Sequence, residues 1–188
     1  MSIKRLQETL TQVPIVKKGN YHYVIHPITD GIPSIAPELL QGVTDEMYQR
    51  IKKYGKIEKI VTMEAMGIPL AAALSLKMKL PFTIIRKKSY GLPDEISVEQ
   101  VTGYSKAHLY VNGLKRGERI VIVDDVLSTG GTLRAVLTVL KKMEVRVQGA
   151  IIAIDKGNVA EKIAQESGVA IETLVKIDVV DGKVVFKS

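Results

Sequence analysis

The chain has 188 residues, of which 46% are hydrophobic and 25% are charged, a mixture that is typical of a globular protein and excludes a largely disordered one. Lys and Arg exceed Asp and Glu by 27 − 20 = 7, and because these basic residues are scattered, they favour a pocket for a small, highly anionic molecule over a nucleic-acid-binding surface. The absence of cysteine excludes disulfides and thiolate metal sites.

The N-terminal stretch, Met1 to Thr11, is polar and amphipathic and lacks the apolar core of a signal peptide. It predicts a helix from Ile3 to Leu10, which is followed by a short strand from Tyr21 to Ile25. The segment from His26 to Pro37 is punctuated by Pro and Gly and is expected to be irregular. A helix is expected from about Thr44 to Tyr54, where apolar residues recur four positions apart.

Further along the chain, short apolar strands alternate with helices, which predicts an α/β fold with a mostly parallel, open sheet flanked by helices. The run Ile120 to Val123 is apolar without alternation, as in a strand that is covered on both faces. Asp181-Gly182 is typical of a hairpin turn. The expected strands are Lys59 to Met63, Pro81 to Arg86, Arg119 to Asp124, Val147 to Ile154 and Ile171 to Ile177, and the expected helices are Ile68 to Met78, Thr132 to Met143 and Asn158 to Ser167.

One segment, Lys87 to Gly103, has no clear period, and a long loop in a compact domain is usually either a functional lid or disordered. Tyr104 to Val111 is expected to return to the sheet as a strand. No linker or repeat interrupts the chain, so we expect one domain over residues 1–188. The longest apolar runs, such as Ile68 to Leu76, are too short to span a membrane. Together with the absence of cysteine and of a signal-peptide core, this leads us to expect a cytoplasmic protein.

The segment with the clearest chemistry is Asp124 to Thr132, where a buried strand ends in two acids and a Ser/Thr/Gly-rich turn opens a helix. The backbone N–H groups of this turn and the positive end of the helix form a cradle for an anion. The two acids are placed to bind sugar hydroxyls or to stand near a metal. The segment has neither Gly-Lys-Ser/Thr nor G-x-G-x-x-G, which argues against nucleoside triphosphates and dinucleotides.

From Val121 to Thr132 the chain resembles the phosphoribosyl-pyrophosphate signature of type I phosphoribosyltransferases. The resemblance implies that Asp124 and Asp125 meet the ribose 2′- and 3′-hydroxyls, directly or through Mg²⁺ that arrives with the substrate. It also implies a 5′-phosphate site, whose residues are Ser128, Thr129, Gly130, Gly131 and Thr132. The alternative is a strand-to-helix turn with helix caps only.

A second strand–turn–helix, Glu64-Ala65-Met66-Gly67, resembles the pyrophosphate loop of this family, although it could also be an ordinary turn. Adenine phosphoribosyltransferases place an arginine where Met66 stands, and they have a glutamate near the end of the lid, where this chain has Gly103. The resemblance thus argues against adenine as the base.

The cluster Arg86-Lys87-Lys88 would hold the leaving pyrophosphate, or would otherwise be a solvated charged face. The segment of about 87–103 resembles the family's flexible lid, which closes to exclude water.

The base site is predicted around Lys156, in the segment Ile154 to Asn158, which resembles that of xanthine phosphoribosyltransferases. An ammonium group only donates hydrogen bonds, so it favours a 6-oxo group over a 6-amino group. Lys156 could also be a surface lysine. The resemblance implies a hood over the base, largely within residues 1–42, with the loop near 155–158 beside it.

Over nearly its whole length the chain is most similar to the archaeal hypoxanthine/guanine branch of this family, which implies purine salvage to IMP and GMP, Mg²⁺ as cofactor and a homodimer. The apolar helix from Ile68 to Met78 is either an interface or a core element. Adenine- or xanthine-specific enzymes remain alternatives, as does a regulator that senses phosphoribosyl pyrophosphate, although the residues before Tyr21 are too few for a helix-turn-helix unit. Asp125 is the carboxylate best placed to act in catalysis, together with Asp124.

The histidines and tyrosines carry weaker expectations. His22, His26 and His108 have no metal-ligand spacing, so we expect them to be structural, although His26 could lie near the base. Any of the residues Tyr21, Tyr23, Tyr90 and Tyr104 could stack on a purine, but packing is the expected role of each.

Overall fold

A six-stranded sheet forms the centre of the computed structural model, which describes residues 2–19, 21–102 and 105–187. In spatial order its strands are β10 (Lys183–Lys187), β9 (Ile171–Val180), β8 (Arg146–Asp155), β7 (Arg119–Leu127), β3 (Lys59–Met63) and β4 (Phe82–Ile85). All neighbours pair in parallel except β10, which returns antiparallel to β9 after the turn at Asp181-Gly182. The predicted fold class and the predicted hairpin are confirmed.

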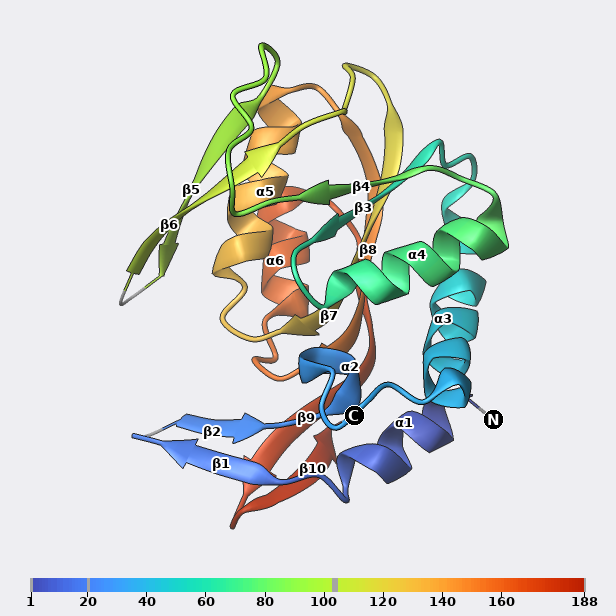
Figure 1. Cartoon of the computed structure of the whole chain (residues 1–188), viewed down its shortest axis with the longest axis vertical. Helices are drawn as coiled ribbons and strands as arrows, with labels where there is room; N and C mark the ends of the chain where they lie inside the picture. Colours follow the sequence, from blue (N-terminus) through green and yellow to red (C-terminus); the bar gives the residue numbers. More distant parts are fainter. Residues whose placement is uncertain (1, 20, 103–104, 188) are drawn as a thin grey trace.

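Helices cover both faces of this sheet (Figure 1). The helices α1 (Ser2–Leu10), α3 (Pro37–Ile51) and α4 (Gly67–Met78) pack on one face, and α5 (Gly131–Lys142) and α6 (Ala160–Ser167) on the other. Because successive side chains of a strand point to opposite faces, Val121 and Val123 enter one core while Ile120 and Ile122 enter the other. None of the described helices is long and apolar enough to cross a membrane.

Two antiparallel hairpins extend from the same side of the molecule in Figure 1: β1 (Ile15–Lys18) with β2 (Tyr21–Val24), and β5 (Ile96–Thr102) with β6 (Ser105–Val111). The expectation that residues 87–103 form a loop without regular structure is wrong from Ile96 onward. Val98 is buried opposite Leu109, so core packing stabilises this strand. The polar residues beside Val98 gave the sequence no apolar pattern that would predict a strand. Gly103 and Tyr104 lie outside the described residues.

Prolines at helix starts account for two further differences. The helix expected from Thr44 begins at Pro37, and the segment expected to be irregular contains the short helix α2 (Pro27–Asp30). In both helices Pro occupies the first turn, where its missing N–H has no helical partner to lose. The same residue type therefore starts these helices instead of breaking them.

Candidate functional site

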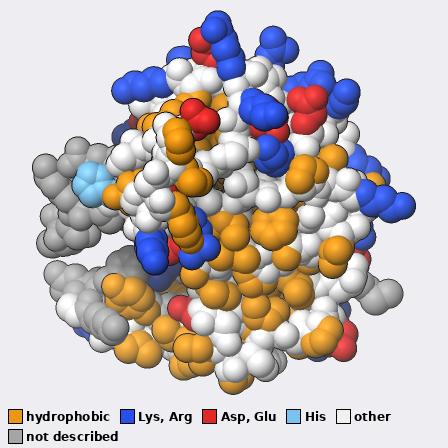
Figure 2. Space-filling view, turned by 45° about the horizontal axis from the view of Figure 1, so that its top comes forward, with side chains coloured by type: hydrophobic (Ala, Val, Ile, Leu, Met, Phe, Trp, Pro, Cys, Tyr) orange, Lys and Arg blue, Asp and Glu red, His pale blue; other side chains and the backbone are white. Residues whose placement is uncertain are grey.

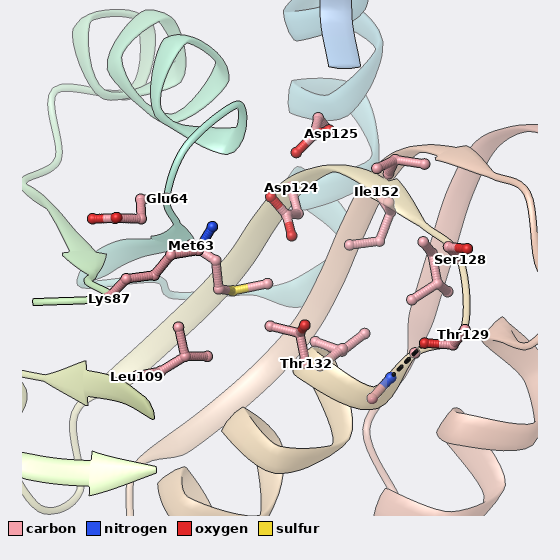
Figure 3. Close-up of a pocket in the computed structure, with 15 residues that line it drawn as sticks. Met63, Glu64, Lys87, Leu109, Asp124, Asp125, Ser128, Thr129, Thr132 and Ile152 are labelled. Atoms are coloured by element: carbon pink, nitrogen blue, oxygen red, sulfur yellow. Dashed lines mark hydrogen bonds between the residues drawn. The ribbon is translucent and has the colours of Figure 1, made fainter. Parts of the chain in front are cut away.

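A cleft of about 300 Å³ opens at the carboxyl ends of β3 and β7 (Figure 3), where ligands of parallel sheets usually bind. Figure 3 shows Asp124 between two walls, one made by Glu64 and Lys87 and the other by the loop that precedes α5. The sequence-predicted residues that line the cleft are Glu64, Lys87, Asp124, Asp125, Ser128, Thr129, Gly130, Gly131 and Thr132.

The loop Ser128 to Thr132 connects β7 to the first turn of α5, so backbone N–H groups and the positive helix end face the cleft. The loop is supported from behind by Arg134, whose Nη1 donates to the carbonyl of Thr129 at 2.9 Å and whose Nε lies 2.7 Å from a Glu166 carboxylate oxygen on α6. Sequence reasoning missed Arg134, because its partner on α6 is 32 positions away.

Asp124 and Asp125 lie on β7 itself, which continues to Leu127 and not only to Asp124 as expected. Burial raises the pKa of Asp124 well above its ordinary value, and the neighbouring Asp125 carboxylate raises it further. Burial also raises the pKa of Asp125 to about 6, and the negative charge of Asp30 contributes to this rise. Two acids that resist ionisation together are suited to a positively charged or hydrogen-bond-donating ligand.

Only part of the predicted pyrophosphate loop lines the cleft. Glu64 lines the cleft, whereas Ala65 and Met66 are not among its lining residues, and the Met66 side chain extends towards Gly31. Gly67 begins α4 in close contact with Asp124: a Cβ atom at this position would lie 2.5 Å from Asp124 Oδ1. A glycine here therefore lets α4 approach the acidic pair.

Only part of the basic cluster at residues 86–88 lines the cleft as well. Lys87 lines the cleft, whereas Arg86 and Lys88 are not among its lining residues. Arg86 Nε lies 2.5 Å from Glu64 Oε2, and its guanidinium lies over the ring of Tyr90. Arg86 therefore compensates the negative charge of Glu64 at the edge of the cleft.

A second pocket, of about 180 Å³, adjoins the cleft and shares Val126 and Ser128 with it. Tyr23 and Val24 of β2 form one wall, and Thr29 and Asp30 of α2 form another. Ile154 and Lys156 complete it from the end of β8. The structure thus brings Lys156 beside the segment in which the hood was expected.

The loop that carries Lys156 is fastened to the strand that carries the acids. The backbone N–H groups of Lys156 and Gly157 donate to the carbonyl of Leu127 at 2.8 and 3.2 Å. Buried Asp155 accepts hydrogen bonds through Oδ1 from the N–H groups of Gly157 and Asn158. A Cβ atom on Gly157 would lie 1.7 Å from the carbonyl oxygen of Ser128, so the two loops are in direct backbone contact.

The Lys156 ammonium donates to the carbonyl of His22 and lies 5.7 Å from the centre of the Tyr23 ring. This lysine is half-buried, and it connects the β1–β2 hairpin to the end of β8. Lys156 is therefore more than a solvated surface residue.

His26 is fully buried at the wall of the second pocket. Its Nδ1 accepts from the N–H of Ile28, so Nε2 carries the proton and donates to Thr9 Oγ1 at 2.9 Å. Burial lowers the pKa of His26 to about 4. Among the described residues no three His, Asp or Glu side chains form a group that could hold a metal ion.

Comparison with known proteins gives the following matches. Residues 34–177 match the family described as "Phosphoribosyl transferase domain". A protein of Methanocaldococcus infernus named hypoxanthine/guanine phosphoribosyltransferase is 51% identical, and the match covers 97% of this chain and 100% of that protein. A protein of the same name from Methanothermobacter thermautotrophicus is 47% identical, with 97% and 93% covered.

Solved structures of adenine phosphoribosyltransferases have the same fold. The Saccharomyces cerevisiae enzyme superimposes with a TM-score of 0.77 at 20% identity, covering 92% of this chain and 98% of that one. The Giardia lamblia enzyme superimposes with a TM-score of 0.75 at 18% identity, covering 94% and 98%. At these identities the likeness extends to the fold alone.

Proposed function

Because the chain belongs to the phosphoribosyl transferase family, we propose that it acts in purine salvage, transferring the 5-phosphoribosyl group of phosphoribosyl pyrophosphate to hypoxanthine or guanine. The products are IMP or GMP and pyrophosphate. Archaeal relatives of this name are about half identical to the chain and match nearly all of it, which supports this base choice over adenine.

The observation that carries the proposal is the continuity of the two pockets. The cleft, which contains the acidic pair and the Ser128 to Thr132 loop, meets the smaller pocket beside Lys156 at Val126 and Ser128. A donor in the cleft would therefore present its ribose to a base in the second pocket, and holding two reactants in such an arrangement removes much of the entropic cost of their reaction.

We assign the donor to the cleft residue by residue. The backbone of Ser128 to Thr132 binds the 5′-phosphate, and the carboxylates of Asp124 and Asp125 accept hydrogen bonds from the ribose hydroxyls. For the pyrophosphate we assign Glu64 and Lys87, which line the cleft, and the backbone of Ala65, Met66 and Gly67 beside them. Arg86 and Lys88 flank Lys87 outside the lining and add positive charge at the edge of the cleft.

The two carboxylates fit Mg²⁺, since this ion is usually held by one or two carboxylates and takes its other ligands from substrate phosphates and water. Asp124 and Asp125 would hold it, in part through the substrate. When bound, the ion would neutralise charge on the departing pyrophosphate.

The reaction itself is a displacement at the ribose C1 by a purine ring nitrogen. Lys156 orients the base by donating to its 6-oxo group, and Asp125 lies where the base meets the ribose. The hood, within residues 1–42, and the lid, near 87–103, keep water away from the reacting carbon. We assign no general base.

We further propose a homodimer and a cytoplasmic location. Leu76 on α4 is 83% exposed, which favours burial of that helix face against a second copy. The donor is a highly charged molecule that does not cross membranes unaided, so the protein is expected in the compartment in which the donor is made.

The first test is nucleotide formation with Mg²⁺ and phosphoribosyl pyrophosphate, with adenine, hypoxanthine, guanine and xanthine offered separately. IMP and GMP without AMP are expected. AMP as the main product would overturn the base choice but not the donor site. No product with any base, despite bound donor, would favour a sensor of the donor.

A further inference from the structure

The second pocket presents a negative side chain opposite the cationic one. Lys156 enters it from the end of β8, and Asp30 enters it from α2 in the N-terminal segment. Asp30 is exposed, and its charge acts on Asp125. Asp30 therefore lies close both to the base pocket and to the sugar-binding acids.

The hydrogen bonds that Asp30 accepts from other described residues all reach one of its two carboxylate oxygens. Its Oδ2 accepts from the backbone N–H of His26 at 2.9 Å and from Thr29 Oγ1 at 2.6 Å. Within the described residues, no hydrogen bond or ion pair occupies Oδ1. The carboxylate is thus held in place by one atom and offers the other as an acceptor.

The other nearby carboxylates have partners of their own. Asp178 forms an ion pair of 2.7 Å with Lys187 and accepts from the N–H of Val179. Asp155 is fully buried beneath the loop that it supports. Among the described residues that line the second pocket, Asp30 is the only one with a carboxylate side chain.

The four purine bases differ on the edge that follows the 6-position. Hypoxanthine and guanine carry an N1–H donor beside the 6-oxygen, and guanine adds a 2-amino donor. Xanthine keeps the N1–H but carries an acceptor oxygen at position 2 in place of the amino group, whereas adenine has an unprotonated N1. A carboxylate only accepts hydrogen bonds, whereas an ammonium only donates them.

We propose that Asp30 determines base specificity together with Lys156: its free carboxylate oxygen accepts from the N1–H and 2-amino edge of guanine or hypoxanthine and repels the 2-oxygen of xanthine. This inference rests on the proposed function, because it concerns the base that the same reaction consumes. A site that is built to bind a donor rejects an analogue that presents lone pairs there.

The test is Asp30→Asn, which retains an oxygen for His26 and Thr29 but replaces the free oxygen with an N–H donor. We expect the ratio of kcat/KM for guanine to that for xanthine to fall on the order of 10- to 100-fold, with little change in KM for the donor. Asp181→Asn is the matched control: it makes the same chemical change at an exposed acid in the β9–β10 turn, which lines neither pocket, and is expected to preserve the ratio.

The outcomes separate this inference from the function on which it rests. A wild-type protein that forms no nucleotide from any base overturns the proposed function. An active wild type with an unchanged guanine-to-xanthine ratio in Asp30→Asn overturns the role of Asp30 alone. An equal loss for all bases also overturns it, because it indicates only a structural role in α2.

Binding to the wild-type protein provides a measurement that needs no variant. Calorimetric titration with the product nucleotides is expected to show GMP binding at least about tenfold more tightly than XMP. Equal affinities would contradict the proposal even if Asp30→Asn failed to fold.

Discussion

Asp125 differs from its neighbour in what surrounds it, although both acids lie on β7. It is 8% exposed and faces the charge of Asp30, whereas Asp124 contacts the start of α4 at Gly67. Asp125 lines the cleft next to Val126, which both pockets share, whereas Asp124 is packed against the start of α4. We expect their substitutions to have different consequences.

Asp125→Asn is expected to lower kcat on the order of 100-fold while changing the KM for phosphoribosyl pyrophosphate much less, because an amide keeps the shape but loses the charge beside the reacting carbon. Steady-state kinetics with varied donor would measure both constants. Unchanged turnover would remove the catalytic role of Asp125, and Asp181→Asn in the distant hairpin turn serves as control.

Gly157→Ala is expected to weaken binding of the base and of the donor together. The new Cβ would lie 1.7 Å from the Ser128 carbonyl oxygen, so one of the two loops must move. Such overpacking typically costs about 1–3 kcal/mol. Isothermal titration with each substrate would measure the effect.

The matched control for Gly157→Ala is Gly168→Ala. It strains a left-handed backbone at the end of α6, but its Cβ would meet no atom within 4 Å. Loss of affinity in both variants would mean that general destabilisation, and not contact between the loops, is the cause.

At the scale of elements, α1 and α2 are joined through His26, which starts α2 and bonds to Thr9 on α1. Its pKa of about 4 lies below the ordinary value of 6.5, so the unfolded chain binds more protons between these two values. The stabilisation due to neutral His26 is thus complete above pH 6.5 and is lost as the pH falls towards 4.

His26→Asn tests this, because Asn can still begin a helix but does not titrate. Between pH 7 and pH 4 the free energy of unfolding of the wild type is expected to fall by roughly 2–3 kcal/mol more than that of the variant. Denaturant unfolding at several pH values would measure this. Parallel pH profiles of wild type and variant would contradict the prediction, because they would show that folding does not lower the pKa of His26.

The elements also show where sequence reasoning succeeds. The strand β7 and the loop after it could be predicted, because an unbroken apolar run followed by acids, hydroxyls and glycines is a local pattern. β5 and the early part of α3 could not, because the burial of Val98 against Leu109 and the role of Pro37 as a helix start depend on the folded context.

The same limit applies to the site. The donor loop shows an anion-binding pattern in its own residues, whereas Lys156 was singled out through resemblance to known phosphoribosyltransferases, and the roles assigned to both remain predictions. Arg134 and Asp30 were missed as site residues, because their importance comes from partners or pockets that only the folded chain assembles.

The whole molecule has an uneven surface. Figure 2 shows hydrophobic side chains gathered over the right half of one face, the half in which Figure 1 places α4, and Lys and Arg side chains along its upper edge. An exposed apolar area on the surface of a folded domain marks an interaction site more often than chance.

Leu76→Glu is therefore expected to convert the proposed homodimer into a monomer, because it places a charge on the most exposed large apolar residue of α4. Size-exclusion chromatography with light scattering would measure the mass. Val185→Glu, on the 37% exposed position of β10, is the control and should remain dimeric. A monomeric wild type would contradict the proposed homodimer.

The backbone contact between Gly157 and Ser128 has a consequence for how base preference could change over time or in the laboratory. Insertions or bulkier residues in the 155–158 loop would disturb the donor loop that it touches, so variation there carries a penalty in activity with every base. The N-terminal segment around α2 lines the base pocket, and within the described chain no backbone hydrogen bond joins it to the donor loop. Libraries that seek a new base specificity should therefore randomise α2 and the β1–β2 hairpin and leave the 155–158 loop unchanged.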